Sequence, residues 1–267
     1  MTRSRQIAGR VAGPLLGIAA LLTTKSFALA SARIGVVLLH GTLAAPSELD
    51  DVAKYLTDAG YVVEVPEMCW SKDRHYDKPY LECLSEIDPA VERLKATGAT
   101  AIVIGGFSVA GSAAIAYGAR HDGLAGIIGL APAHQPERLA KEPHIAKSLA
   151  LAARLNEAGK GNQVADFANY AVGKAFTTPM KARVYPTFFA ATSPGYMPTN
   201  MPKLKAPILW VAGAADKTQL GPAYAFDKAP KNPLDRYVKV SSDHFGTPVA
   251  AKDAVLAWLK ELAAAQP

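Results

Sequence analysis

A short segment, Gly106–Gly111 with the sequence Gly-Phe-Ser-Val-Ala-Gly, restricts the possible folds of this chain more than any other feature. It follows the apolar run 101–105, which predicts a buried strand, and precedes the small-residue run 112–117, which predicts a helix. A serine in a sharp strand-to-helix turn has a strained backbone, and its hydroxyl is exposed at the carboxyl edge of a sheet. Small neighbours allow the strand and the helix to pack closely. The context therefore favours Ser108 as a nucleophile.

The match to the G-x-S-x-G pattern of such turns is imperfect, because Ala110 stands where the last glycine is expected. One additional methyl group is compatible with a close strand–helix contact. The alternative interpretation is a glycine-rich turn that holds an incidental serine. Nucleotide binding is disfavoured, because the segment lacks both the Lys-Ser/Thr ending of a phosphate loop and the G-x-G-x-x-G spacing.

Two later segments supply the partners that a nucleophilic serine needs, a histidine base and a carboxylate that fixes the histidine tautomer. An apolar strand that begins at residue 206 runs into a loop with Asp216, and a second strand, 236–240, is followed by His244. Ser108, Asp216 and His244 thus each follow a predicted strand, in the order Ser, Asp, His. Because sites form at the carboxyl edge of open parallel sheets, we predict that the three side chains meet there.

The loop after the first predicted strand supplies backbone groups for the same edge of the sheet. Residues 34–39 form that strand, and His40-Gly41-Thr42-Leu43 follow it. We expect an N–H of this loop and the N–H of Val109 to stabilise an oxyanion. The sequence does not separate Thr42 from Leu43 as the upstream donor, and we expect His40 to hold the loop by hydrogen bonding.

The remaining titratable candidates fit the site less well. His134 ends another predicted strand and could face the site, but the chain order argues against it as the base. Asp243 adjoins His244, so that its side chain would point away from the imidazole in most backbone geometries. We expect the other histidines to lie on the surface or in an insert: His75, His121 and His144.

These motifs together resemble those of the α/β-hydrolase superfamily. The resemblance depends on His40-Gly41-Thr42, on the segment 106–111, on Gly213 with Asp216, and on His244, and it covers most of residues 33–265. It implies a mostly parallel, doubly wound sheet of about six strands flanked by helices, with a helical lid insert. It also implies an esterase-like serine hydrolase that cleaves a carboxylic ester or thioester of a small molecule through an acyl-serine, without cofactor or metal. Some members of the superfamily have lost activity, so a non-catalytic binding protein is the alternative.

Strand-like and helix-like patterns alternate along the chain, as a parallel sheet with covered faces requires. Besides the strands above, 61–66 and 124–130 are predicted strands, and 47–59, 80–97 and 248–264 are predicted helices, with Pro89 as a possible kink and Val249 among the buried residues of the last helix. We expect residues 134–205 to be the lid insert, with helices near 137–158 and 164–175. Four aromatic residues of the insert either line an acyl pocket or pack the insert onto the sheet: Tyr185, Phe188, Phe189 and Tyr196.

The N-terminus has the order of a secretory signal, with basic residues first, an apolar run at 11–22, and small residues to 32. We predict a signal peptide over residues 1–30, a single domain over 31–267, and a periplasmic or secreted protein. The apolar run is shorter than the roughly 20 residues of a membrane span, so no stable membrane insertion is expected after cleavage.

The net charge of +6 does not indicate a nucleic-acid partner. Residues 1–30 contain four basic residues and no acidic one, so the remainder is close to neutral, and no basic stripe with interleaved aromatic residues is present. The two cysteines, Cys69 and Cys83, lack the spacing of metal ligands. In an exported protein they either form a disulfide or remain two partly buried thiols.

Overall fold

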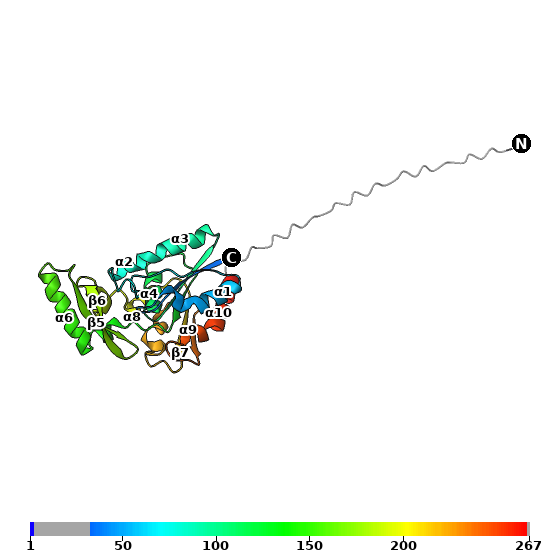
Figure 1. Ribbon diagram of the computed structural model, residues 1–267. Coiled ribbons are helices and arrows are strands. Elements are labelled where there is room, and N and C mark those ends of the chain that lie inside the picture. Colours follow the sequence, from blue (N-terminus) through cyan, green and yellow to red (C-terminus); the bar gives the residue numbers. More distant parts are fainter. Residues whose placement is uncertain (3–32, 266–267) are drawn as a thin grey trace. The chain divides into compact units, whose positions relative to one another are not determined.

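A parallel six-stranded sheet forms the centre of the computed structural model, which describes residues 1–2 and 33–265 (Figure 1). The strand order is β2-β1-β3-β4-β7-β8. The strands are β1 (Ile34–Leu39), β2 (Val62–Glu64), β3 (Ala101–Phe107), β4 (Gly126–Leu130), β7 (Ile208–Gly213) and β8 (Arg236–Val240). The predicted sheet of about six mostly parallel strands is thus confirmed. The predicted signal peptide lies outside the described residues.

Helices cover both faces of this sheet because the central strands are buried on both sides. On one face, α1 (Asp50–Asp58) and α10 (Lys252–Ala265) pack side by side, in blue and red in Figure 1. On the other face lie α2 (Tyr80–Leu84), α3 (Asp88–Ala96) and α4 (Val109–Gly118). A hydrophobic core lies on each face of the sheet, and alternate residues of β1 point into the two. Val36 packs on the face of α1 and α10, and Val37 packs on the face of α2, α3 and α4.

The register of the sheet brings several strand ends to one edge. Leu39 of β1 pairs with Gly106 of β3, Phe107 of β3 pairs with Leu130 of β4, and Gly213 of β7 pairs with Val240 of β8. Since the strands are parallel, the loops that follow them emerge together at their carboxyl ends. The loops with the predicted site residues are therefore neighbours.

Two predicted helices are interrupted. The segment 80–97 divides into α2, a 3-10 turn (η2, Ser85–Ile87) and α3, and Pro89 stands in the first turn of α3, where its missing N–H costs no helical hydrogen bond. The last helix divides into α9 (Thr247–Ala250) and α10. The expected burial of Val249 is wrong, because this residue lies on the short α9 and is 48% exposed.

The insert contains a β-hairpin where the sequence analysis expected a second helix. After α5 (Pro136–Leu139) and α6 (Pro143–Glu157), β5 (Val164–Ala171) pairs antiparallel with β6 (Lys174–Lys181). Val172 and Gly173 connect them with φ of 47° and 81°, which is the two-residue turn with two positive φ angles that suits a hairpin. The helix predicted near 164–175 is therefore wrong. Figure 1 shows α6 beside this hairpin.

Three of the four aromatic residues considered in the insert belong to the core, and the fourth, Tyr196, is half-buried. Tyr185, Phe188 and Phe189 are at most 1% exposed on α7 (Tyr185–Phe189), and they pack with Phe167 of β5 and Tyr76. They therefore attach the insert to the rest of the domain. The chain then continues through α8 (Met197–Asn200) to β7.

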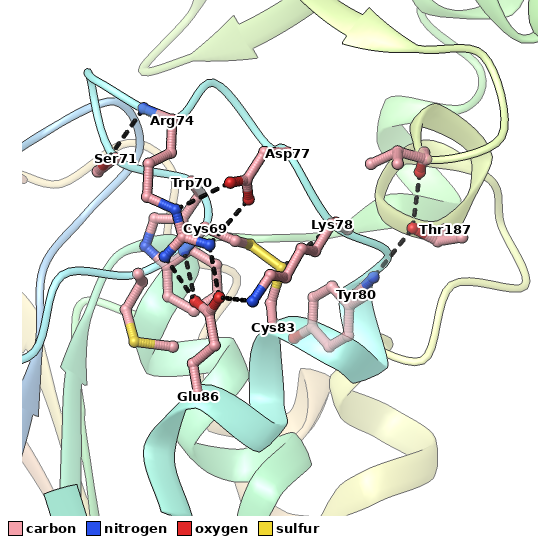
Figure 2. The surroundings of a disulfide bond; sticks show 12 residues. Cys69, Trp70, Ser71, Arg74, Asp77, Lys78, Tyr80, Cys83, Glu86 and Thr187 are labelled. Carbon is pink, nitrogen blue, oxygen red and sulfur yellow. Dashed lines mark hydrogen bonds and ion pairs between the residues drawn. A yellow bond between two sulfur atoms is a disulfide. The ribbon is translucent and has the colours of Figure 1, made fainter. Parts of the chain in front are cut away.

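Cys69 and Cys83 form a disulfide, which links the segment after β2 to α2 (Figure 2). Of the two possibilities left open by the sequence, the bonded pair is the one observed. None of the helices within the described residues is both long enough and apolar enough to cross a membrane.

Candidate active site

Ser108 lies in a strained turn between β3 and α4. Its backbone has φ 57° and ψ −117°, a conformation that L-residues rarely adopt. The turn requires Gly106, since a Cβ there would come within 2.2 Å of the carbonyl oxygen of Ala110. Ala110 itself is fully buried in α4, so its methyl group is accommodated. The strand–turn–helix context predicted around Ser108 is thus present.

His244 lies between Ser108 and Asp216. Its Nε2 is 2.9 Å from the Ser108 hydroxyl oxygen, and its Nδ1 is 2.7 Å from Oδ2 of Asp216. Because a carboxylate only accepts hydrogen bonds, Nδ1–H is the donor to Asp216, and Nε2 is left to accept the Ser108 proton. The imidazole is 3% exposed and packs against the Phe107 ring at 5.0 Å. The structure therefore brings together the three side chains that the sequence placed on separate strand ends.

Asp216 is held as a carboxylate. The backbone N–H and the hydroxyl of Thr218 donate to its Oδ1 at 2.8 and 2.7 Å, and Gln219 donates to Oδ2 at 3.3 Å. Burial raises the pKa of Asp216, but the hydrogen bonds from His244 and Thr218 outweigh burial and hold that pKa below its usual value. Asp216 is therefore ionised at neutral pH and can orient the imidazole.

The sequence predicts Thr42 or Leu43 as the upstream oxyanion donor and Val109 as the second donor. Thr42 and Val109 line the same cavity as Ser108, and Val109 is the first residue of α4, whose N–H has no partner within the helix. The N–H of Leu43 instead donates to the Trp70 carbonyl at 2.9 Å. Leu43 is therefore not the upstream oxyanion donor, and the alternative that named it is wrong. Among the hydrogen bonds of residues 33–265, none uses the N–H of Thr42.

Glu48 is a polar group near the site that the sequence analysis missed. Its Oε2 accepts the N–H of Gly41 at 2.6 Å, at the start of the loop that carries Thr42. Burial raises the pKa of the Glu48 carboxyl, while the Gly41 N–H and the neighbouring His244 act in the opposite direction. No local pattern around Glu48 could have revealed this contact, since it closes only when the turn after β1 has formed.

The other histidines and acids have separate roles. His40 donates from Nδ1 to the Gly41 carbonyl and accepts the Met68 N–H at Nε2, so it holds its loop as expected. His134 borders the cavity, but its Nε2–H donates to the Phe188 carbonyl at 2.9 Å. Burial lowers the pKa of His134 to about 4, so the ring is neutral at pH 7. The exposed Asp243 accepts the Gly246 N–H rather than contacting the imidazole.

Ser108 and His244 open into a cavity of about 670 Å³. The loops at the strand ends form its floor, and α5 and the turn of the β5–β6 hairpin form further walls. Besides Asp216, five charged residues border it: Arg138, Glu142, Lys174, Lys217 and Asp243. None of the four aromatic residues considered for an acyl pocket, 185, 188, 189 and 196, lines this cavity.

Comparison with solved structures identifies the fold. The α/β-hydrolase GrgF from Penicillium sp. sh18 is 15% identical, with a TM-score of 0.64 over 88% of this chain and 92% of its own. A structure of the metagenome-derived lipolytic enzymes LipS and LipT is 17% identical, with a TM-score of 0.62 over 86% and 95%. The protein has the α/β-hydrolase fold. The thioesterase domain from the curacin biosynthetic pathway is similar as well, at 16% identity and a TM-score of 0.56 over 85% and 91%.

Sequence comparison alone does not reach this assignment, since no protein-family model and no curated protein matches the chain. Identities of 15–17% establish the α/β-hydrolase fold and leave the reaction open. Function must therefore be argued from the geometry of the site.

Proposed function

We propose that this protein is a serine hydrolase that cleaves a carboxylic ester or thioester through an acyl-serine intermediate. The observation that carries the proposal is the buried chain of hydrogen bonds from Ser108 through His244 to Asp216. A binding protein has no need for a strained serine whose hydroxyl is 2.9 Å from the basic nitrogen of an oriented imidazole. The lipolytic enzymes and the thioesterase domain among the similar structures support the same reaction class.

The proposed reaction follows from the tautomer of His244. Nε2 takes the proton of Ser108 while Oγ attacks the acyl carbon, and Asp216 stabilises the imidazolium that forms. The imidazolium then protonates the leaving group, and the acyl-serine remains. Water, deprotonated by the same nitrogen, attacks the acyl-serine and releases the acid, while the imidazolium returns the proton to the Ser108 oxygen. The backbone N–H groups of Thr42 and Val109 stabilise the oxyanion in both steps, a contribution of about 3 kcal/mol for each well-placed donor.

We infer that the substrate carries a short or polar acyl group. The charged border of the cavity disfavours a long hydrocarbon chain, and Tyr185, Phe188 and Phe189 are buried in the core rather than lining the cavity. We also infer that the insert 134–205 acts as a lid, since α5 and the hairpin turn supply walls of the cavity.

The export of the protein remains a proposal of the same kind. The order of charge, apolar and small residues in 1–30 supports a signal peptide, and the disulfide suits an oxidising compartment such as the periplasm or the exterior. Detection of the processed chain in a periplasmic or culture fraction, with an N-terminus near residue 31, would support it. Recovery of the unprocessed chain in the cytoplasm alone would contradict it.

A series of nitrophenyl esters tests the reaction and the acyl preference together. We expect turnover of acetate and butyrate esters to exceed that of the palmitate ester by at least tenfold, and Ser108→Ala to abolish turnover. Ser241→Ala is a matched control, since Ser241 is exposed after β8 and should leave turnover unchanged. Absence of turnover by the folded wild type on every ester and thioester tested would favour the non-catalytic alternative.

A further inference from the structure

The loop that carries Thr42 is held by a segment from outside the site. Residues 67–79 lie in the connection between β2 and α2, and we call them the Trp70 loop. Trp70 binds the loop 40–44 twice: its indole N–H donates to the His40 carbonyl and its carbonyl accepts the Leu43 N–H, both at 2.9 Å. Two further bonds flank these, from the Met68 N–H to His40 Nε2 at 3.0 Å and from the Lys72 N–H to the Ala44 carbonyl at 2.9 Å.

The two contacts of Trp70 bracket the peptide group that carries the Thr42 N–H. The preceding peptide group is fixed at its carbonyl by the Trp70 indole and at its N–H by Glu48. The following peptide group is fixed at its N–H, that of Leu43, by the Trp70 carbonyl. Leu43 has φ 49°, a left-handed conformation that a leucine adopts only where its surroundings impose it. The Gly41 carbonyl, in the same peptide group as the Thr42 N–H, accepts a hydrogen bond from His40 Nδ1 at 3.0 Å. The direction of the Thr42 N–H therefore depends on Trp70 together with His40.

The Trp70 loop is in turn attached to α2 and the turn after it (Figure 2). Cys69, next to Trp70, is bonded to Cys83, and its N–H donates to Oε2 of Glu86 at 2.9 Å. Arg74 and Lys78, further along the loop, both pair with Glu86. Trp70 and the two cysteines are fully buried, so water does not compete for the contacts of these three residues. The disulfide and Glu86 thus fix the Trp70 loop on the side away from the loop 40–44.

We propose that Trp70 is a positioning residue for the oxyanion contact at Thr42, held in place by the Cys69–Cys83 disulfide and Glu86. This inference rests on the proposed function, because it assigns a purpose to the direction of the Thr42 N–H. Trp70 does not border the cavity that contains Ser108, so its effect on substrate is indirect. Loss of the Trp70 hydrogen bonds should weaken stabilisation of the transition state more than binding of the ester, because the ester carbonyl carries less negative charge than the oxyanion.

The first test is Trp70→Phe, which removes the indole N–H and retains an aromatic ring. We expect kcat to fall about tenfold while KM changes less than twofold, the pattern of an interaction made in the transition state. A trifluoromethyl ketone, which adds to the serine and places an oxyanion in the same position, should bind more weakly by the factor lost in kcat/KM. Unchanged kcat and ketone affinity would overturn the proposal.

Trp258→Phe is the matched control. Trp258 is also buried, and its indole N–H also donates to a backbone carbonyl, that of Leu234, at 2.7 Å. It lies on α10, away from the loop 40–44. We expect this variant to lose stability and to retain kcat. An equal loss of kcat in both variants would show a general effect of core damage and would overturn the proposal.

The tether is tested with the double variant Cys69→Ala/Cys83→Ala, for which we expect a several-fold lower kcat at unchanged KM. Wild-type kcat in the folded double variant would overturn the role of the disulfide. Glu86→Gln provides the same test without removing the covalent bond, in case the double variant does not fold.

Failure of the proposed function is distinguishable from failure of this inference. If the wild type does not react with esters or the ketone, the proposed function fails. Amide hydrogen exchange then still reports how firmly Trp70 holds the loop 40–44. We expect faster exchange at Leu43 and Met68 in Trp70→Phe and not in Trp258→Phe. Equal protection at Leu43 in all three proteins would overturn the inference on either route.

Discussion

The surroundings of Asp216 keep its side chain ionised, and Asp216 in turn fixes the orientation of the His244 ring. Thr218 and Gln219 donate hydrogen bonds to the carboxylate and fix its orientation. Oδ2 then accepts Nδ1–H of His244 in a single geometry. An amide in the same place could donate to Nδ1 and would stabilise the opposite tautomer, which leaves no acceptor for the Ser108 proton.

We therefore expect Asp216→Asn to retain its fold and to lose kcat by a factor on the order of 10³–10⁴. Steady-state hydrolysis of nitrophenyl acetate gives the measurement, and circular dichroism gives the control for folding. Asp227→Asn, at an exposed acid that does not border the cavity, should retain wild-type kcat. Comparable activity of Asp216→Asn and wild type would contradict the assigned role of Asp216.

His134 predicts a pH dependence of stability. Burial lowers its pKa from 6.5 to about 4, so between these values the unfolded chain binds more protons than the folded chain. The unfolding free energy then falls as the pH falls through this window, by about 3 kcal/mol when the pH reaches the folded pKa. Above pH 6.5 His134 adds no pH dependence.

The measurement is urea unfolding of wild type and His134→Gln at several pH values from 7 to 4. The glutamine amide can still donate to the Phe188 carbonyl but cannot titrate. We expect the wild type to lose stability more steeply on acidification, while losses due to Asp216 cancel in the comparison. Parallel curves would show that His134 is not a buried neutral ring.

At the scale of elements, the sequence predicted what is encoded in continuous runs. The strands 34–39 and 101–107 are apolar on both faces, and only a covered parallel sheet uses such runs. The hairpin β5–β6 was mistaken for a helix because its apolar residues do not alternate strictly, and because Val172, a β-branched residue, occupies a position with positive φ. The stacking of Phe167 of β5 on Tyr185 favours the hairpin over a helix.

The turn of this hairpin can be improved. Val172 has φ 47°, which costs a β-branched residue about 1 kcal/mol relative to asparagine. We expect Val172→Asn to raise the unfolding free energy by about that amount, measured by thermal or urea unfolding. Val164→Asn, at an exposed position at the start of the same hairpin, should give no gain. A loss of stability in Val172→Asn would contradict the description of the turn.

At the scale of the whole molecule, the site could be predicted as far as it follows from strand order. Ser108, Asp216 and His244 stand at strand ends, and parallel strands in register bring such ends to one edge. The choice of Thr42 over Leu43 could not be predicted, because it depends on Trp70 from a distant segment. Glu48 and the Trp70 loop were missed for the same reason: their contacts are non-local and have no periodic pattern.

The disulfide should contribute to the stability of the whole domain. It joins residues 14 apart in sequence, and closing a loop of this size in the unfolded chain is worth about 3 kcal/mol. We expect the Cys69→Ala/Cys83→Ala variant to lose at least about this much unfolding free energy in urea. Equal stability of the variant and the oxidised wild type would contradict this estimate.

The central claim is that Ser108 is a nucleophile activated by His244, and covalent labelling tests it most directly. A fluorophosphonate should attach to the folded wild type, peptide mapping should place the adduct on Ser108, and labelling should disappear in Ser108→Ala and slow strongly in His244→Ala. A folded wild type that takes up no label, or an adduct that persists in Ser108→Ala, would contradict the account.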